Sequence, residues 1–166
     1  TTSSNLSTTH HVYDNELDSW STAAALPTAT RAPCGVTLRD GRLVVIDGYN
    51  RGGLNATQIY DPSTDTWSQG ATAPATHGWY CAAARGANGQ VYVFGGEGAP
   101  AAVSIYDPVA NTWSSGATMP AGRKGHGAVH FRDGAIHVFG GTGIGALASM
   151  DIYDTAQNTW SSGVAM

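Results

Sequence analysis

The chain of 166 residues carries little positive charge, with one lysine, Lys124, and seven arginines against 12 acidic residues. Its formal net charge is −4, whereas a protein that binds a phosphate backbone needs a basic stripe. Nucleic acid is therefore not expected as a partner. The sequence also lacks any apolar run near the roughly 18 residues that a membrane-crossing helix needs, so no membrane partner is expected.

Motifs of several common enzyme classes are missing as well. The sequence has no Gly-x-Ser-x-Gly nucleophile elbow, no glycine-rich phosphate loop and no His-Glu-x-x-His zinc motif. Acidic residues such as Asp14 and Asp18 recur at turn positions in every repeat described below, so a structural role explains them better than acid catalysis. We therefore assign no catalytic residue and expect no cofactor.

The sequence is rich in internal repeats. Tyr-Asp occurs four times, at steps of 47, 46 and 47 residues, and a tryptophan follows each copy at the same steps. These anchors are Tyr13, Tyr60, Tyr106 and Tyr153, followed by Trp20, Trp67, Trp113 and Trp160. A fixed period between about 20 and 50 residues is typical of solenoids, propellers and repeat arrays.

Each full period also contains an apolar segment that ends in Gly-Gly, at residues 90–96 and 135–141, with Asp-Gly instead at residues 42–48. A strand ending in Gly-Gly, then Tyr-Asp, then Thr-Trp, then a small-residue strand bearing Arg or His resembles the kelch repeat. The resemblance covers residues 10–166 and implies an all-β fold of four-stranded antiparallel blades in a β-propeller. It includes a distant similarity to the propeller domain of galactose oxidase. Kelch propellers serve many functions, so the resemblance says less about activity.

Turn and strand signals agree with this interpretation. Residues 43–46 are apolar at every position, which indicates a strand covered on both faces, as in a blade between two neighbours. Asx-Gly pairs at Asp40-Gly41, Asn88-Gly89 and Asp133-Gly134 predict tight hairpins between the inner two strands. We expect the innermost strands near residues 32–38, 79–84 and 125–131.

The repeat boundaries divide the chain into a loop and four sheet units. Residues 1–9 are predicted to be a loop, and residues 10–22 the two outer strands of a half-blade. Three full blades are then predicted at 23–69, 70–115 and 116–166. The sequence thus predicts a partial propeller of three full blades and an N-terminal half-blade.

Three and a half blades do not close a ring comfortably, because propellers close with about four to eight blades. A bare blade face of roughly 350 Å² forgoes on the order of 9 kcal/mol of apolar burial. We therefore expect the missing blades of a longer propeller, or a second chain, to cover these faces. The free edge at Val12 and Tyr13 is expected to pair with a second polypeptide, or the half-blade to be displaced.

Cys34 and Cys81 are 47 residues apart, which predicts equivalent places on the inner strands of adjacent blades. Three alternatives stay open: two buried thiols, a disulfide between neighbouring strands, or a functional cysteine. In galactose oxidase an inner-strand cysteine is cross-linked to a tyrosine beside copper, and residues 79–81 invite that comparison. The remaining ligands of that site have no matching motif in this sequence.

Histidines offer a possible metal site. His126 and His130 fall on one face of a predicted strand, with His137 on the next strand. Recognisable spacing for a fourth ligand is missing, and kelch repeats commonly place a histidine at the position of His126. Packed or hydrogen-bonded histidines are therefore favoured, and we assign no metal ligand.

The loops at one mouth of the propeller are the best candidates for ligand binding. In kelch propellers that bind peptides, this mouth is built from the loops between the outermost and next innermost strands and between the second and third strands. Arginine and aromatic side chains there are typical binding anchors. The matching residues are Arg31, Tyr49, Asn50, Arg51, Trp79, Glu97, Arg123 and Thr142.

The sequence therefore favours a non-catalytic recognition or scaffold module that binds a protein or a glycan, and we expect any ligand to contact Arg31, Arg51 or Arg123. The alternative is the propeller part of a secreted carbohydrate-active enzyme or copper oxidase. The Ser/Thr/Gly/Ala-rich, lysine-poor composition is typical of an extracellular protein.

Overall fold

The computed structural model describes residues 6–165, which form strands and connecting loops. No helix in that range is long and apolar enough to cross a membrane. The strands are β1 (His10–Asp14), β2 (Ser19–Ala23), β3 (Cys34–Thr37), β4 (Leu43–Ile46), β5 (Thr57–Asp61), β6 (Thr66–Gln69), β7 (Ala82–Arg85), β8 (Val91–Phe94), β9 (Val103–Asp107), β10 (Thr112–Ser115), β11 (Gly127–His130), β12 (Ile136–Phe139), β13 (Met150–Asp154) and β14 (Thr159–Ser162).

These strands form one two-stranded and three four-stranded antiparallel sheets. We call them the half-blade (β1–β2), blade 1 (β3–β6), blade 2 (β7–β10) and blade 3 (β11–β14). Within each sheet the strands follow one another in chain order. The predicted all-β architecture, with three full blades after an N-terminal half-blade, is confirmed.

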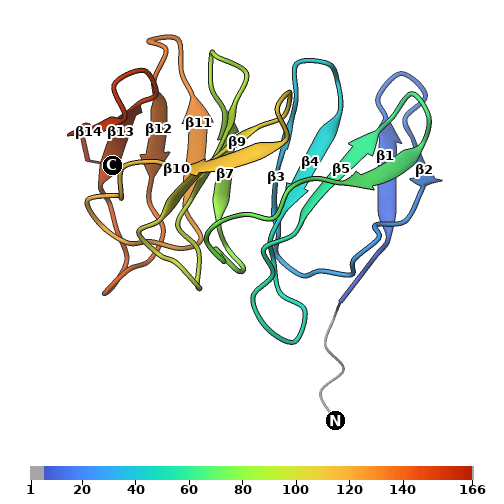
Figure 1. The fold of residues 1–166 in the computed structure, drawn as a ribbon, viewed down its shortest axis with the longest axis horizontal. Coiled ribbons are helices and arrows are strands. Elements are labelled where there is room, and N and C mark those ends of the chain that lie inside the picture. The colour runs from blue at the N-terminus through green and yellow to red at the C-terminus, as the bar shows by residue number, and fades with distance from the viewer. Residues whose placement is uncertain (1–5, 166) are drawn as a thin grey trace.

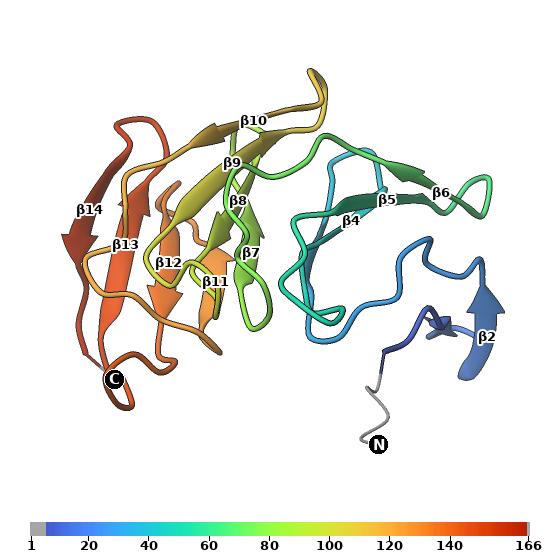
Figure 2. The same ribbon diagram turned by 60° about the horizontal axis from the view of Figure 1, so that its bottom comes forward.

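The sheets lie side by side in an open arc. Figure 1 shows the half-blade at one end of the molecule and blade 3 at the other. The first strand of each full blade lies innermost, since β3 contacts β7 and β7 contacts β11. From these strands the blades fan outward, with β6, β10 and β14 at the periphery (Figure 2).

Two hydrophobic cores fill the spaces between the full blades. Val91 and Val93 of β8 join the core between blades 1 and 2, while Tyr92 and Phe94 of the same strand join the core between blades 2 and 3. Successive side chains of a strand point to opposite faces. A blade with a neighbour on each side therefore needs a strand that is apolar at every position.

A repeated set of polar contacts links each full blade to the unit before it. The indole N–H groups of Trp67, Trp113 and Trp160 donate to the carbonyl oxygens of Ala24, Ala71 and Ala117, each at 2.8 Å. The N–H of the same alanine donates to an Asp or Asn side chain, which also accepts from the tyrosine hydroxyl of that blade. We call this set of Tyr, Asx and Trp the blade staple.

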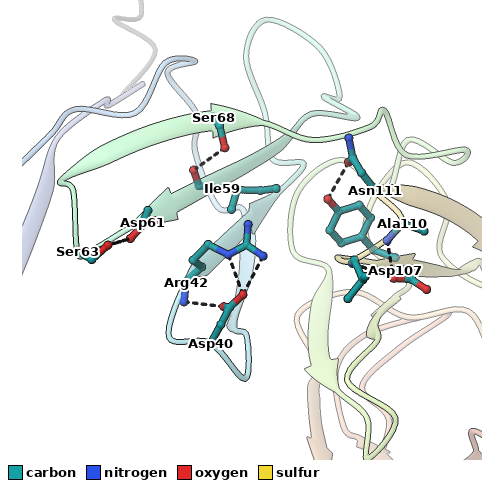
Figure 3. A network of polar contacts seen from close by, with 11 residues as sticks. Asp40, Arg42, Ile59, Asp61, Ser63, Ser68, Asp107, Ala110 and Asn111 are labelled. Carbon is teal, nitrogen blue, oxygen red and sulfur yellow. Dashed lines mark hydrogen bonds and ion pairs between the residues drawn. The ribbon is translucent and has the colours of Figure 1, made fainter.

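Blade 2 illustrates the staple. Asn111 Oδ1 accepts from the Tyr106 hydroxyl at 2.8 Å and from the Ala71 N–H at 2.7 Å. Figure 3 shows Asn111 beside the turn in which Asp107 accepts from the Ala110 N–H. The repeated Tyr-Asp and Thr-Trp sequences thus have a packing function, since they tie neighbouring blades together.

The half-blade packs on blade 1 through His10, whose ring lies 4.5 Å from that of Tyr60 and 5.6 Å from that of Trp67, centroid to centroid. Its strand β1 pairs with β2, and it has no other ladder within residues 6–165. Pairing of the β1 edge with a second polypeptide therefore stays a prediction. Residues 1–5 of the predicted loop lie outside the described residues, and Ser7 forms a bridge with Thr30.

The inner strands begin later than expected, two residues after a residue with positive φ. These residues are Ala32 (φ 50°), Tyr80 (φ 63°) and Gly125 (φ 62°). Backbone in this region cannot continue a strand. Each inner strand therefore starts only where the chain has left this turn.

Candidate binding surface

The loops that precede the inner strands β3, β7 and β11 meet the loops that follow the second strands β4, β8 and β12. Together they form one mouth of the partial propeller. The backbone of Arg31 forms a bridge with that of Tyr49, and Lys124 forms the same bridge with Thr142. In blade 2 the Glu97 N–H donates to the Trp79 carbonyl at 2.9 Å. Arg31, Trp79 and Lys124 therefore occupy equivalent positions, each facing Tyr49, Glu97 or Thr142 of its own blade.

Side chains from these positions form a row across blades 1 to 3. The Arg31 guanidinium carbon lies 4.8 Å from the centroid of the Tyr49 ring, a cation–π geometry. That ring meets Trp79 edge to face at 4.9 Å. On the far side of Trp79, the Lys124 ammonium and the Glu97 carboxylate form an ion pair. We call these residues the mouth row: Arg31, Tyr49, Trp79, Glu97, Lys124 and Thr142.

Backbone hydrogen bonds hold the mouth row in place. The Tyr80 N–H donates to the Ala32 carbonyl at 3.2 Å, and the Gly125 N–H donates to the Tyr80 carbonyl at 2.9 Å. The loop with Asn50 is closed by the Asn50 N–H, which donates to the Gly52 carbonyl at 2.9 Å. The surface is therefore formed by loops fixed on a rigid sheet scaffold, where propellers place recognition residues.

A hollow of about 420 Å³ opens in the mouth row between blades 2 and 3. Its lining includes the charged pair Glu97 and Lys124, the backbone of Gly96 and Gly122, and the apolar side chain of Ile144. Ile144 is fully exposed at the rim. The hollow thus lies beside an ion pair and an exposed apolar side chain.

The structure brings seven of the eight predicted residues to this end. Arg31, Arg51, Glu97 and Thr142 are exposed, while Tyr49, Asn50 and Trp79 are partly buried. Arg51 adopts a φ of 55°, an uncommon backbone conformation for a non-glycine residue. Their roles in binding are proposals.

Arg123 does not join them, because its side chain is fully buried. Its guanidinium pairs with Asp151 and donates to the carbonyl oxygens of Gly140 and Ser149, each at 3.3 Å. The expectation that Arg123 contacts a ligand is therefore corrected. The residue at the third mouth position is its neighbour Lys124, which counting back from the inner strand would have found.

Beneath the mouth row, polar side chains support the loops. The His77 Nδ1–H donates to the Gly95 carbonyl at 2.7 Å, and Nε2 of the same ring hydrogen-bonds the Ser104 hydroxyl at 2.8 Å. Asp47 is 1% exposed, and its Oδ2 accepts from the His77 N–H at 3.1 Å, while its Oδ1 has no hydrogen-bond partner in residues 6–165. Burial raises the pKa of Asp47 to about 8. The carboxyl is therefore protonated at neutral pH.

Cys34 and Cys81 are joined as a disulfide with a Cα–Cα distance of 5.6 Å. Cys34 is the first residue of β3, whereas Cys81 lies one position before β7, so the prediction that the two cysteines hold equivalent places is wrong. The side chains of two residues at the same position of adjacent blades would point in the same direction around the arc, so they would not face each other. The one-residue offset turns one side chain to face the other, because successive positions alternate in direction.

This disulfide also bears on the galactose oxidase comparison. The Cys81 sulfur is bonded to Cys34, so it is not cross-linked to a tyrosine. Tyr80 lies next to it in sequence with a half-exposed side chain. The structure therefore does not contain the cysteine–tyrosine cross-link of galactose oxidase with which residues 79–81 were compared.

The three histidines of the possible metal site do not converge. His137 bonds Asp133 at 2.7 Å, and burial lowers the pKa of His126 to about 4, assisted by the nearby Arg123 charge. Within residues 6–165, no three His, Cys, Asp or Glu side chains lie close enough together to hold a metal ion.

Comparisons with known proteins agree on the repeat. Residues 30–74 and residues 78–120 match two family models, each described as a Kelch motif. Kelch-like protein 23 from Pongo abelii and that from Homo sapiens are each 33% identical over 96 residues, which cover 55% of this chain and 17% of the relative. The chain thus spans less than a fifth of these curated relatives.

Two solved structures share the fold. A copper-bound fungal alcohol oxidase of the AA5 family superposes with a TM-score of 0.62 at 22% identity, over 80% of this chain and 30% of the oxidase. YjhT superposes with a TM-score of 0.78 at 16% identity, over 97% of this chain and 66% of that protein. At these identities the likeness concerns the arrangement of blades alone.

Proposed function

Because the chain belongs to the kelch-repeat family of β-propeller proteins, we propose that it is a recognition module that binds a protein through the mouth row. The observation that carries this proposal is the continuous row of Arg31, Tyr49, Trp79, Glu97 and Lys124 across three blades. Arginine and aromatic residues are the side chains most often found at the centre of protein interfaces.

The chemistry of the row specifies the kind of partner. An acidic side chain of a partner would meet Arg31, and an apolar side chain would enter the hollow beside Ile144. The Glu97–Lys124 pair at the rim would select orientation more than it would add affinity, because exposed ion pairs contribute little. A short peptide segment with an acidic and an apolar residue is therefore the proposed ligand.

A glycan is the second candidate ligand, and it is supported by the Tyr49 and Trp79 rings at the same mouth. An extracellular location accords with the Cys34–Cys81 disulfide, since disulfides persist in oxidising compartments. Further blades, from a second chain or from a longer polypeptide, are proposed to cover the two end faces of the arc.

Selection of peptides from a displayed library on the immobilised chain tests the proposal. Peptides recovered in this way should bind the Arg31→Ala and Tyr49→Ala variants at least about tenfold more weakly, the loss typical of an interface anchor. Arg39 is an exposed arginine in the hairpin between β3 and β4, at the opposite end of blade 1, so Arg39→Ala is the matched control and should bind normally.

Unchanged peptide affinity in both mouth variants would contradict the proposal. A glycan array probed with the same three proteins distinguishes the second ligand class. Binding to glycans that depends on Tyr49 but not on Arg39, with no selected peptide, would replace the protein ligand by a carbohydrate.

A further inference from the structure

The blade staple has nearly constant geometry in the three full blades. Its tyrosine and tryptophan rings lie 5.1, 5.0 and 4.9 Å apart in blades 1, 2 and 3. The Asx residue between them has a φ of 51°, 53° and 56° at Asp65, Asn111 and Asn158. In each case the staple is closed on an alanine of the preceding unit, through both its N–H and its C=O.

The half-blade carries a fourth staple with the same internal geometry. The rings of Tyr13 and Trp20 lie 5.2 Å apart, Asp18 has a φ of 48°, and the Tyr13 hydroxyl donates to Asp18 Oδ1 at 2.5 Å. Trp20 is nevertheless 70% exposed. No hydrogen bond of its indole N–H is found within the described part of the chain, residues 6–165.

The other end of the arc presents the complementary residue. In the full blades a glycine after the last strand donates its N–H back to the third strand, and the next residue receives the staple. After blade 3, the Gly163 N–H donates to the Met150 carbonyl at 2.8 Å, as the Gly116 N–H does to Val103 at 2.9 Å. Val164 therefore stands where Ala117 stands after blade 2, and it is 83% exposed.

The apolar surroundings of Val164 also match. At the contact of blades 2 and 3, the ring of Phe94 lies 5.8 Å from both Tyr153 and Trp160. Phe139 of blade 3 holds the position of Phe94, since each is the last residue of the second strand before two glycines. Phe139 is partly exposed, so its ring is available to the Tyr13 and Trp20 rings of a neighbouring half-blade.

We infer that two copies of this chain associate head to tail through these surfaces. The Trp20 indole of one copy donates to the Val164 carbonyl of the next, the Val164 N–H donates to Asp18, and the two half-blade rings pack on Phe139. The occupant is a second copy because this chain already makes the same contact three times within itself. The surfaces differ, so the interface is heterologous and the copies close into a ring or extend.

This association extends the proposal that further blades cover the end faces, and it is independent of ligand binding at the mouth row. Light scattering on the 166-residue chain should show a mass that rises with concentration from 17.1 kDa to at least twice that value. Trp20→Phe keeps an aromatic ring but removes the indole N–H. It should weaken association about tenfold or more.

Position 18 supplies a matched pair of variants. Asp18→Asn should associate as the parent does, because Asn111 and Asn158 accept the same bond in blades 2 and 3. Asp18→Ala should not associate. Since Trp20 is exposed in the single chain, thermal unfolding of the dilute monomer should be unchanged by Trp20→Phe, which separates lost association from lost folding.

A mixing experiment tests the direction of the contact. Trp20→Ala removes the staple from one end, and Val164→Pro removes the N–H from the other, so each variant alone should be monomeric. A mixture should form a one-to-one complex, because each variant retains the surface that the other lacks. A monomeric parent at high concentration, association that survives both variants, or a mixture that stays monomeric would each overturn the inference.

Discussion

At the scale of single residues, Asp47 makes the stability of the fold depend on pH. Its folded-state pKa of about 8 lies above the value near 3.9 of an unfolded chain. The folded state therefore binds a proton more tightly, and stability falls as pH rises towards 8. His126 acts in the opposite sense between about pH 4 and 6.5, because its neutral form is favoured by burial.

Above about pH 6.5 the histidine contribution is complete, so Asp47 dominates from there to about pH 8. Urea unfolding of the parent chain should show a free energy of unfolding that drops by about 1.5–2 kcal/mol across this window. Asp47→Asn keeps a residue that tolerates positive φ and should flatten the curve. An equal slope in parent and variant would show that Asp47 is not responsible.

The sequence could not predict the exact residue at which each inner strand begins, and these starting points decide which residues reach the site. The outer anchors repeat at 47, 46 and 47 residues, but β3, β7 and β11 begin at residues 34, 82 and 127, which are 48 and 45 apart. That difference moves the third mouth position from Arg123 to Lys124. It also sets Cys81 one place before its strand, which the even spacing of the cysteines conceals.

At the scale of elements, the blade staples should contribute measurably to stability. Trp113→Phe removes the N–H that donates to the Ala71 carbonyl at 2.8 Å, and this partly buried carbonyl then keeps only the Thr57 hydroxyl as its side-chain donor. We expect a loss of about 1–2 kcal/mol in the free energy of unfolding. The measurement is urea denaturation of the variant beside the parent at a concentration where the chain is monomeric.

Trp20→Phe is the control for that substitution, because the same residue type at the same repeat position has no alanine to bond within residues 6–165. Its free energy of unfolding should lie within about 0.5 kcal/mol of the parent. Equal losses in the two variants would mean that the indole hydrogen bond does not stabilise the contact between blades.

The outer strands were predictable where the staple residues occur. The Tyr-Asp and Thr-Trp pairs predict the third and fourth strands of blades 1 and 2 near residues 57–61, 66–69, 103–107 and 112–115, and these ranges coincide with β5, β6, β9 and β10. The reason is physical: the Tyr-Asp and Thr-Trp residues that mark the repeat are also the residues that lock these strands to the preceding blade. Inner strands bear small, variable residues after a turn with positive φ, so their sequence gives no comparable marker.

At the scale of the whole molecule, the count of blades followed from the period of the repeat alone. The row of mouth residues did not, because the contacts of Tyr49 with Trp79 and of Glu97 with Lys124 join different blades. No pattern local to one repeat specifies such neighbours. The complementary ends of the arc could not be predicted from the sequence either. The match between Trp20 and Val164 follows only from the hydrogen bonds that the three full blades make to the preceding unit.

The central claim is that this arc of kelch blades recognises its ligand at the mouth row. Two-dimensional ¹H–¹⁵N spectra of the labelled chain, titrated with a selected peptide, test it most directly. The amides that shift are expected to cluster at residues 31–32, 49–53, 78–80, 97 and 142–146. Shifts that cluster instead at the opposite end, around the hairpin turns at residues 39–41, 88–90 and 133–134, would contradict it.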